Sequence, residues 1–286
     1  MQTEQFALHA NIEDKHWWFL ARRAILNNVV RSLVPPGKRK TIVDIGCGTG
    51  ANIASFSKQY QCVGIDTSQE AIALARSRFP QVDFIEGFAP GSLKDTATEA
   101  DLFLVTDVIE HVRDDFLLLS QLMAASKPGA YFVITVPALM SLWSTHDVSF
   151  GHFRRYDRKR LQAVWEGLPV QELLLSYYNS RLLPIVWSLR FIGRLRGQAW
   201  GENSTDFSLP SYPVNNALRR IFYGESVSLL RCLAQNRKGL NNWTNRGLGV
   251  SLIAVLQRQE GDVIPRIRPP SFIDPFDPER GQDKAA

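Results

Sequence analysis

The sequence Val43-Asp44-Ile45-Gly46-Cys47-Gly48-Thr49-Gly50 says more about the architecture of this 286-residue chain than any other stretch. It ends an apolar, β-branched run and opens a helical pattern over 51–60. Glycines at such a turn let the backbone approach a ligand closely, and the helix N-terminus favours an anionic group. Asp66 ends the next apolar run, where a carboxylate can accept both hydroxyl groups of a ribose. We therefore predict a nucleoside-binding unit; the alternative is a tight turn with a capping Asp.

Short apolar runs alternate with helical patterns on both sides of this unit. Strands separated by helices of this length form βαβ units with right-handed crossovers and a parallel sheet. The sequence therefore predicts an α/β fold: a doubly wound, mostly parallel, seven-stranded Rossmann-like sheet with a helical insertion before the last strand. The expected strands are 41–45, 61–65, 82–85, 101–106, 131–136, 170–177 and 249–257, and the main helices are 51–60, 68–79, 114–125 and 161–168.

Three regions are expected along the chain. Residues 1–40 form an N-terminal helical lid, with one helix over 12–34 that ends at a Pro-Pro-Gly sequence. Residues 41–261 form the main domain, and its insertion, 178–247, is far longer than an ordinary connection. Residues 262–286 are rich in proline and are expected to be largely disordered.

Composition narrows the class of protein. With 45% apolar and 21% charged residues the chain can form an ordinary core, and a net charge of +5 predicts no nucleic-acid partner. Cys47, Cys62 and Cys232 lie far apart and show neither a disulfide framework nor a zinc spacing, which favours a reducing compartment. No signal peptide is evident, and the longest apolar run, 182–189, is too short to span a bilayer. We expect a cytoplasmic location, with membrane association left open.

The glycine turn favours one nucleoside ligand over another. Asp44 lies where a carboxylate would repel a pyrophosphate but can hold an ammonium group, and Gly50 adds a third alternate glycine. S-adenosylmethionine carries an amino-acid end, a sulfonium and a ribose, and it suits such a loop. Two alternatives remain. An NAD(P)-dependent oxidoreductase fits the Gly46-x-Gly48-x-x-Ala51 spacing, and the chain could also be a catalytically silent module that binds the cofactor or docks on a membrane.

These motifs resemble those of class I S-adenosylmethionine-dependent methyltransferases of the small-molecule type, a group that includes the ubiquinone-biosynthesis O-methyltransferases. The resemblance implies that the glycine turn holds the methionine end of the cofactor and that Asp66 holds the ribose. Members of the family often have Gly-Asp-Ala after the third strand, where this chain has Gly87-Phe88-Ala89, so Phe88 can instead pack on the adenine. The expected cofactor residues are Asp44, Gly46, Cys47, Gly48, Gly50, Asp66, Thr67, Phe88 and Asp107.

A second constellation follows the fourth strand, at an end of the sheet that faces the ligand crevice. Asp107, Glu110 and His111 are spaced i, i+3 and i+4, so on a helical turn they share one face. Such a group can act as a base or bind a divalent cation, or it can be an acidic helix N-terminus. The resemblance extends to small-RNA 3′-end methyltransferases, which bind a metal with such a segment and a later histidine. We expect Asp107, Glu110 and His111 to be catalytic, with His111 as the base, and Asp107, Glu110, His111 and His152 to be the candidate metal ligands.

Aromatic and basic residues flank the crevice in two loops after the fifth strand and in the N-terminal lid. Paired arginines can bind a carboxylate or phosphate of an acceptor, although solvated arginines in a plain connector are the alternative. The expected substrate residues are Trp17, Trp18, Trp143, His146, His152, Arg154, Arg155 and Tyr156.

The insertion is the most basic part of the chain. Residues 178–247 hold ten basic and three acidic residues, a balance of +7, so the remainder of the +5 chain is −2. The apolar stretch 179–197 carries four arginines and no acid, and such segments lie on anionic membranes, cover an apolar pocket or simply pack on the domain. We therefore expect methyl transfer to a small-molecule acceptor, acidic or lipid-like, at a hydroxyl oxygen.

Overall fold

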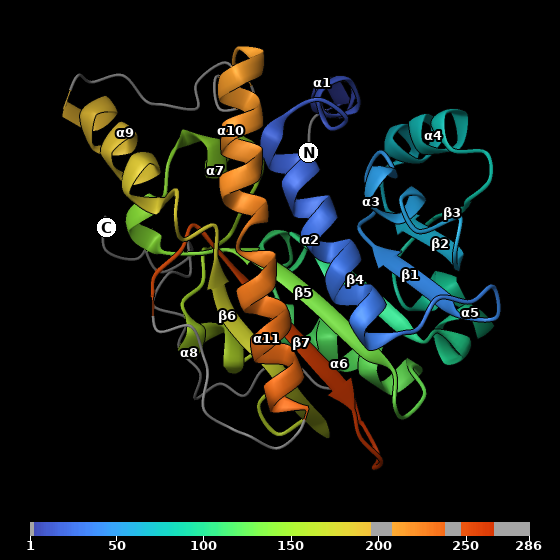
Figure 1. The fold of residues 1–286 in the computed structure, drawn as a ribbon. Helices are drawn as coiled ribbons and strands as arrows, with labels where there is room; N and C mark the ends of the chain where they lie inside the picture. Colours follow the sequence, from blue (N-terminus) through green and yellow to red (C-terminus); the bar gives the residue numbers. More distant parts are fainter. Residues whose placement is uncertain (1–2, 196–207, 238–246, 266–286) are drawn as a thin grey trace, which may run out of the picture.

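A computed structural model describes residues 3–195, 208–237 and 247–265, so the predicted tail lies outside the described residues from 266 onward. Its centre is a seven-stranded sheet of order β3-β2-β1-β4-β5-β7-β6. The sheet is parallel except for β7, which runs antiparallel to both of its neighbours. This confirms the predicted doubly wound, mostly parallel sheet (Figure 1). The strands are β1 (Thr41–Ile45), β2 (Gln61–Asp66), β3 (Asp83–Glu86), β4 (Leu102–Thr106), β5 (Tyr131–Pro137), β6 (Val170–Tyr178) and β7 (Ser251–Arg258).

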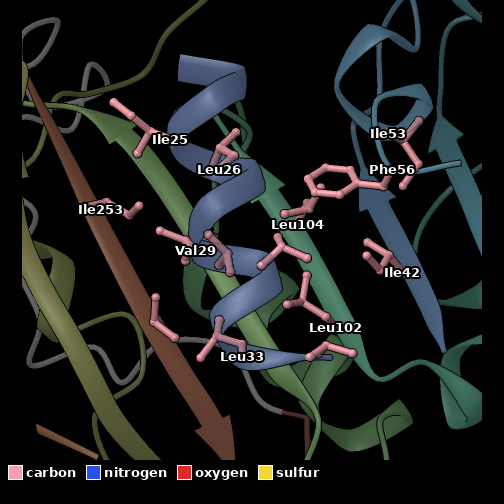
Figure 2. Close-up of a cluster of buried hydrophobic side chains, with 14 of the residues drawn as sticks. Ile25, Leu26, Val29, Leu33, Ile42, Ile53, Phe56, Leu102, Leu104 and Ile253 are labelled. Atoms are coloured by element: carbon pink, nitrogen blue, oxygen red, sulfur yellow. The ribbon is translucent and has the colours of Figure 1, made fainter. Parts of the chain in front are cut away.

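Helices cover both faces of the sheet. Figure 2 shows Ile25 and Val29 of one helix, α2, lying over the central strands, next to Ile253 of β7. These side chains are fully buried, and together with the other helices of this face they form one half of the core. This face carries α2 (Trp17–Leu33), α3 (Ala51–Ala54), α4 (Gln69–Arg78) and α11 (Ser226–Asn236), and the opposite face carries α5 (Asp95–Glu99), α6 (Asp115–Ala125) and α8 (Arg158–Gln162).

The N-terminal segment differs from the single helix predicted over 12–34. It forms α1 (Thr3–Ile12) and α2, and the chain turns between them because His16 caps α2 by accepting a hydrogen bond from Trp18 N. The capping residue is a histidine, which is not among the side chains that favour this position, so the sequence does not indicate where α2 begins. α2 therefore serves two purposes: its middle packs in the core, and its first turn faces the ligand site.

The described part of the insertion before β7 is helical, as expected. It contains α9 (Leu183–Leu195), α10 (Tyr212–Tyr223) and α11, with Pro184 in the first turn of α9 where proline is tolerated. Helices α10 and α11 are separated by Gly224 and Glu225, and a Cβ on Gly224 would lie 2.6 Å from Arg181 Nη1. None of the helices in the described ranges is long and apolar enough to cross a bilayer.

Candidate active site

A cavity of about 530 Å³ lies where β1 and β4 end. The N-terminal helices α1 and α2 line it, together with the glycine turn after β1, the segment after β4, α7 (Thr145–Ser149) and α9. All five histidines of the chain belong to its lining: His9, His16, His111, His146 and His152. Residues from distant parts of the sequence therefore converge on one site, at the carboxyl ends of the parallel strands, where open α/β sheets bind ligands.

The glycine turn forms one wall of the cavity. Gly46 and Gly48 have positive φ angles of 64° and 53°, which favour glycine. A Cβ on Gly46 would lie 2.8 Å from Val108, whereas a Cβ on Gly48 would meet no atom within 4 Å. The backbone at Gly48 is therefore bare on its ligand side. Gly50 has a different role, because its Cβ would lie 2.7 Å from Phe84, and it permits close packing.

Asp44 lies buried behind this turn. It is 1% exposed, and neither carboxylate oxygen has a hydrogen-bond partner among the described residues. Burial raises the pKa of Asp44 to about 7, against the opposing effect of the Arg22 guanidinium. An unpartnered buried carboxylate is costly, and a cationic ligand group nearby would offset that cost. The site therefore suits the ammonium end expected of the cofactor.

The ribose end of the expected cofactor site is built differently. The Asp66 carboxylate accepts hydrogen bonds from Gly48 N and Ser68 N, both at 2.9 Å, so two backbone amides hold it beside the glycine turn. Among the described residues, the cavity lining does not include the predicted cofactor residues Asp44, Gly50, Asp66, Thr67 and Phe88, so Asp44 lies behind the wall formed by Gly46 and Gly48. The ring of Phe88 is 78% exposed, so the predicted adenine packing is not preformed. A glycine-flanked aromatic in a loop has no neighbour that fixes its ring.

Asp107 pairs with a cation that the sequence did not reveal. Arg22 Nη2 lies 2.5 Å from Asp107 Oδ2, and Thr135 Oγ1 donates to Asp107 Oδ1 at 3.2 Å. The backbone of Asp107 is left-handed, with φ 56°, so it does not begin the helical turn that the sequence predicted. Glu110 and His111 lie instead on a separate 3₁₀ turn, Ile109–His111. The prediction that Asp107 shares one helical face with Glu110 and His111 is therefore wrong. Asp107 is not part of the cluster of candidate metal ligands, which consists of Glu110, His111 and His152.

Glu110, His111 and His152 form a cluster whose ligand atoms all lie within 4.8 Å of one another. Glu110 is fully buried, and neither of its carboxylate oxygens has a hydrogen-bond partner in the described part of the chain. Burial, reinforced by the neighbouring Asp107 charge, raises the pKa of Glu110 well above its usual value. The imidazole rings of His111 and His152 meet edge to face, 4.6 Å between centroids. A proton or a metal ion would relieve the buried charge at this point.

A carboxylate orients His152 in the cluster. His152 Nδ1 lies 2.9 Å from Asp147 Oδ1, and because a carboxylate accepts, Nδ1 carries the proton of this hydrogen bond. Arg155 fixes Asp147 in turn, donating from Nε at 2.8 Å and from Nη2 at 3.0 Å. A carboxylate behind a histidine is the arrangement that orients histidine ligands in metal sites and histidine bases in enzymes.

Burial keeps the other histidines neutral. It lowers the pKa of His111 to about 3, that of His146 to about 3 and that of His9 to about 4. Each of these rings is therefore uncharged near neutral pH and has one unprotonated nitrogen, as a base or a ligand must.

The predicted substrate residues divide into two groups. Trp17, Trp18, His146, His152 and Arg155 line the cavity. For Arg154 and Tyr156 the prediction is wrong, because both side chains are buried in another hydrogen-bond network. Arg154 donates to the carbonyl oxygens of Val112 and Arg113. Tyr156 donates to Asp115 Oδ2 at 2.9 Å. Asp115 is fully buried and needs these donors. Trp143 also lies outside the lining described here.

Several lining residues escaped sequence reasoning. Arg22 and His9 come from the N-terminal helices, and Glu13 accepts from the Thr49 hydroxyl at 2.8 Å, which joins the N-terminal segment to the glycine turn. The sequence showed only that charged and aromatic residues are concentrated there. The pairing of Arg22 with Asp107 depends on the tertiary packing of α2 across the sheet, for which a local pattern carries no signal.

The fold and the site together define a class of protein. A family model described as a methyltransferase domain matches residues 17–183, more than half of the chain, so the chain belongs to this family of class I S-adenosylmethionine-dependent methyltransferases. Strand β7, inserted antiparallel between β5 and β6, departs from the 3-2-1-4-5-6 order of the dinucleotide-binding fold. Family and topology thus set aside the NAD(P)-dependent oxidoreductase alternative.

Individual relatives cover only part of the chain. It is similar to a trans-aconitate 2-methyltransferase of Azoarcus sp. (31% identity, 36% of this chain and 42% of the relative) and to norajmaline N-methyltransferase of Rauvolfia serpentina (36% identity, 35% and 37%). The chain thus spans less than half the length of each. The crystal structure of the plantazolicin methyltransferase BpumL shares the fold, with a TM-score of 0.53, 13% identity and 90% of both chains covered. These names differ in acceptor, so similarity identifies the family and not the substrate.

Proposed function

We propose that this chain transfers the methyl group of S-adenosylmethionine to a hydroxyl oxygen of a small, largely apolar acceptor. One observation carries the proposal: the Glu110–His111–His152 cluster and the glycine turn line the same cavity. One wall suits the methyl donor, and the other offers a base or a cation site.

The donor wall supports the cofactor through the glycine turn and two carboxylates, of which Asp44 has no hydrogen-bond partner among the described residues. When bound, S-adenosylmethionine supplies an electrophilic methyl group on its sulfonium. The bare backbone at Gly48 admits its amino-acid end, the unpartnered carboxylate of Asp44 offsets the ammonium charge, and Asp66 stands ready for the ribose hydroxyls. This positioning matters because holding donor and acceptor in line supplies much of the rate in such a transfer.

On the acceptor wall, His111 removes the hydroxyl proton. As the oxygen–methyl bond forms and the sulfur–methyl bond breaks, the proton passes to the His111 imidazole, which burial keeps neutral. Glu110 lies beside the new imidazolium, whose positive charge opposes the burial that raises the pKa of Glu110, so the carboxyl group can ionise next to it. Asp107 has a positioning role through its ion pair with Arg22.

The same cluster favours a second candidate, a divalent cation that assists the reaction. Glu110, His111 and His152 would hold it, with Asp147 behind His152, and this set of one carboxylate and two imidazoles suits a transition metal. Such a cation would lower the pKa of the acceptor hydroxyl. The unpartnered oxygens of Glu110 are the observation that favours it.

The remaining walls indicate an acceptor with an apolar body. Trp17, Trp18 and Phe150 line the cavity together with Leu182 and Val186, which suits an aromatic or lipid-like molecule. Arg190 also lines the cavity and can meet an acidic group on such an acceptor.

Thermal shift and turnover measurements test the proposal. S-adenosylhomocysteine should raise the melting temperature, whereas NAD(P)H should not. Release of S-adenosylhomocysteine is then measured with phenolic, quinol and lipid acceptors. His111→Ala should lower kcat at least a hundredfold with little change in cofactor Kd; unchanged turnover would exclude the base. Cofactor binding without turnover of any acceptor would favour a catalytically silent module.

Chelation separates the base from the cation. If EDTA abolishes turnover and Mg²⁺, Mn²⁺ or Zn²⁺ restores it, the cation is supported; if EDTA has no effect, the base alone is supported. Titration calorimetry with each metal ion alone, on the wild type and on His152→Ala, gives a readout that does not depend on an acceptor. A metal affinity that His152→Ala leaves unchanged would refute the cation site.

A further inference from the structure

Helix α9 is apolar on opposite sides. Ile185 and Leu189, one helical turn apart, line the cavity, and Val186 lies beside them. Trp187 is two residues from Ile185, which places it nearly opposite on the helix, and it is 51% exposed. α9 is not apolar all round, because it also carries Ser188 and Arg190, and an exposed tryptophan on such a helix is typical of a segment that lies at an interface. The outer side of α9 therefore needs an apolar or interfacial environment that the described part of this chain does not fully provide.

The lead into α10 continues the exposed apolar surface. Leu209, Tyr212 and Val214 are 52%, 80% and 50% exposed. In Figure 1 the end of α9 and the start of α10 both lie in the upper part of the view, and α1 lies on the other side of α10 from α9. Pro210, between these exposed residues, lines the cavity, as does Phe6 of α1. The exposed apolar residues thus surround elements that also form the acceptor wall.

The charge of these helices selects the partner. Leu183–Leu195 and Tyr212–Tyr223 together contain four arginines and no acidic residue. Arg219 and Arg220 are exposed on α10. Tryptophan and tyrosine prefer the boundary between water and lipid, and arginines beside them can extend to anionic headgroups. Cationic and aromatic residues around an apolar helix are the composition of a segment that lies in the plane of an anionic membrane.

We propose that exposed residues of α9, of α10 and of the segment before α10, namely Trp187, Leu209, Tyr212, Val214, Arg219 and Arg220, dock on an anionic lipid bilayer. The proposal rests on the proposed function in one respect: docking there would place the acceptor wall next to the membrane, so that an amphiphilic acceptor could pass from lipid into the cavity. Docking needs no membrane-spanning helix, since α9 and α10 would lie along the surface.

Vesicle flotation tests the docking. The full chain, loaded with S-adenosylhomocysteine, is mixed with vesicles of phosphatidylcholine alone or of equal parts phosphatidylcholine and phosphatidylglycerol. We expect binding to the anionic vesicles that weakens with added salt, because screening reduces the attraction. Arg219→Gln with Arg220→Gln should weaken it about 20-fold. The matched control, Arg39→Gln with Lys58→Gln, removes the same charge from exposed residues near β1 and should bind normally.

The aromatic side chains supply a second readout. Trp187→Ser with Tyr212→Ser should lower vesicle binding at least tenfold while leaving the melting temperature and S-adenosylhomocysteine affinity unchanged. Trp187→Phe should keep the binding and lose most of the blue shift in tryptophan emission that vesicles produce.

Three results would overturn the docking: no binding to anionic vesicles, equal loss in the control pair, or self-association through the same residues in place of lipid binding. Because cofactor affinity and turnover on soluble acceptors are measured separately, loss of vesicle binding with these retained refutes only the docking. If the wild type shows no cofactor binding or no turnover, the proposed function is refuted.

Discussion

Replacing Arg22 by methionine should destabilise the protein and weaken cofactor binding together. Arg22 is 5% exposed, and its guanidinium pairs with Asp107 at 2.5 Å and also donates to Thr135. Removing one partner of a buried ion pair costs about 3–5 kcal/mol, because the other charge is left buried. The Asp107 side chain keeps 26% exposure and can regain some water, so we expect the lower end, about 3 kcal/mol.

That loss corresponds to a fall in melting temperature of roughly 6–12 °C for a chain of this size, measured by calorimetry. The cofactor effect has a separate cause. Arg22 opposes the burial that raises the pKa of Asp44 to about 7, so without Arg22 more of Asp44 is protonated at pH 7. S-adenosylhomocysteine should therefore bind more weakly to Arg22→Met at pH 7, with part of the affinity recovered at pH 8.

A double-mutant cycle and a neighbouring arginine provide the controls. Adding Asp107→Asn to Arg22→Met removes the stranded charge and should restore at least 1 kcal/mol. Arg23→Met removes an arginine one position along α2 whose partner Asp14 is 52% exposed, and it should cost no more than about 1 kcal/mol. Additive losses in the double variant, or equal losses for the two arginines, would refute the role given to the buried pair.

Three further predictions follow from the cofactor wall and its surroundings. The folded chain takes up a proton at Asp44 as the pH falls through about 7. The affinity for S-adenosylhomocysteine, measured by calorimetry, should therefore fall up to tenfold per pH unit below 7. The Asp44→Asn variant should bind weakly, with an affinity that does not vary between pH 5.5 and 7. Gly48→Ala should fold at a cost of about 1 kcal/mol but lose cofactor affinity, whereas Gly46→Ala, which clashes with Val108, should lose more stability in urea. Tyr156→Phe should cost about 1–3 kcal/mol with kcat unchanged, and a large fall in kcat at normal stability would contradict its structural role.

The sequence predicted the fold well because the signals were local. Each strand of the sheet was an apolar run next to a turn or a capping residue, and Ser68 caps α4 as expected, accepting from Ala71 N. The glycine turn was equally readable, since the spacing of its glycines is itself the structural requirement.

The acceptor wall was harder because its roles are set by long-range burial. Arg154 and Tyr156 belonged to a conspicuous motif, yet a buried carboxylate at Asp115 takes both of them away from the cavity. Arg22 looked like one arginine among many until the packing of α2 placed it over Asp107. Which of several polar residues faces a ligand depends on which buried charge must be neutralised, and local spacing does not contain that information.

The position of β7 has a consequence for biosynthesis. This strand comes last in the chain, yet it lies between β5 and β6 and forms part of the floor under the N-terminal helix, where Ile25 and Val29 pack near Ile253. Helix α2 is therefore synthesised well before β7, and the part of its apolar side that packs near Ile253 stays uncovered until that strand is in place. Until then two sheet edges stay unpaired, a state prone to aggregation. A nascent chain stopped before Ser251 should need a chaperone and should bind no cofactor.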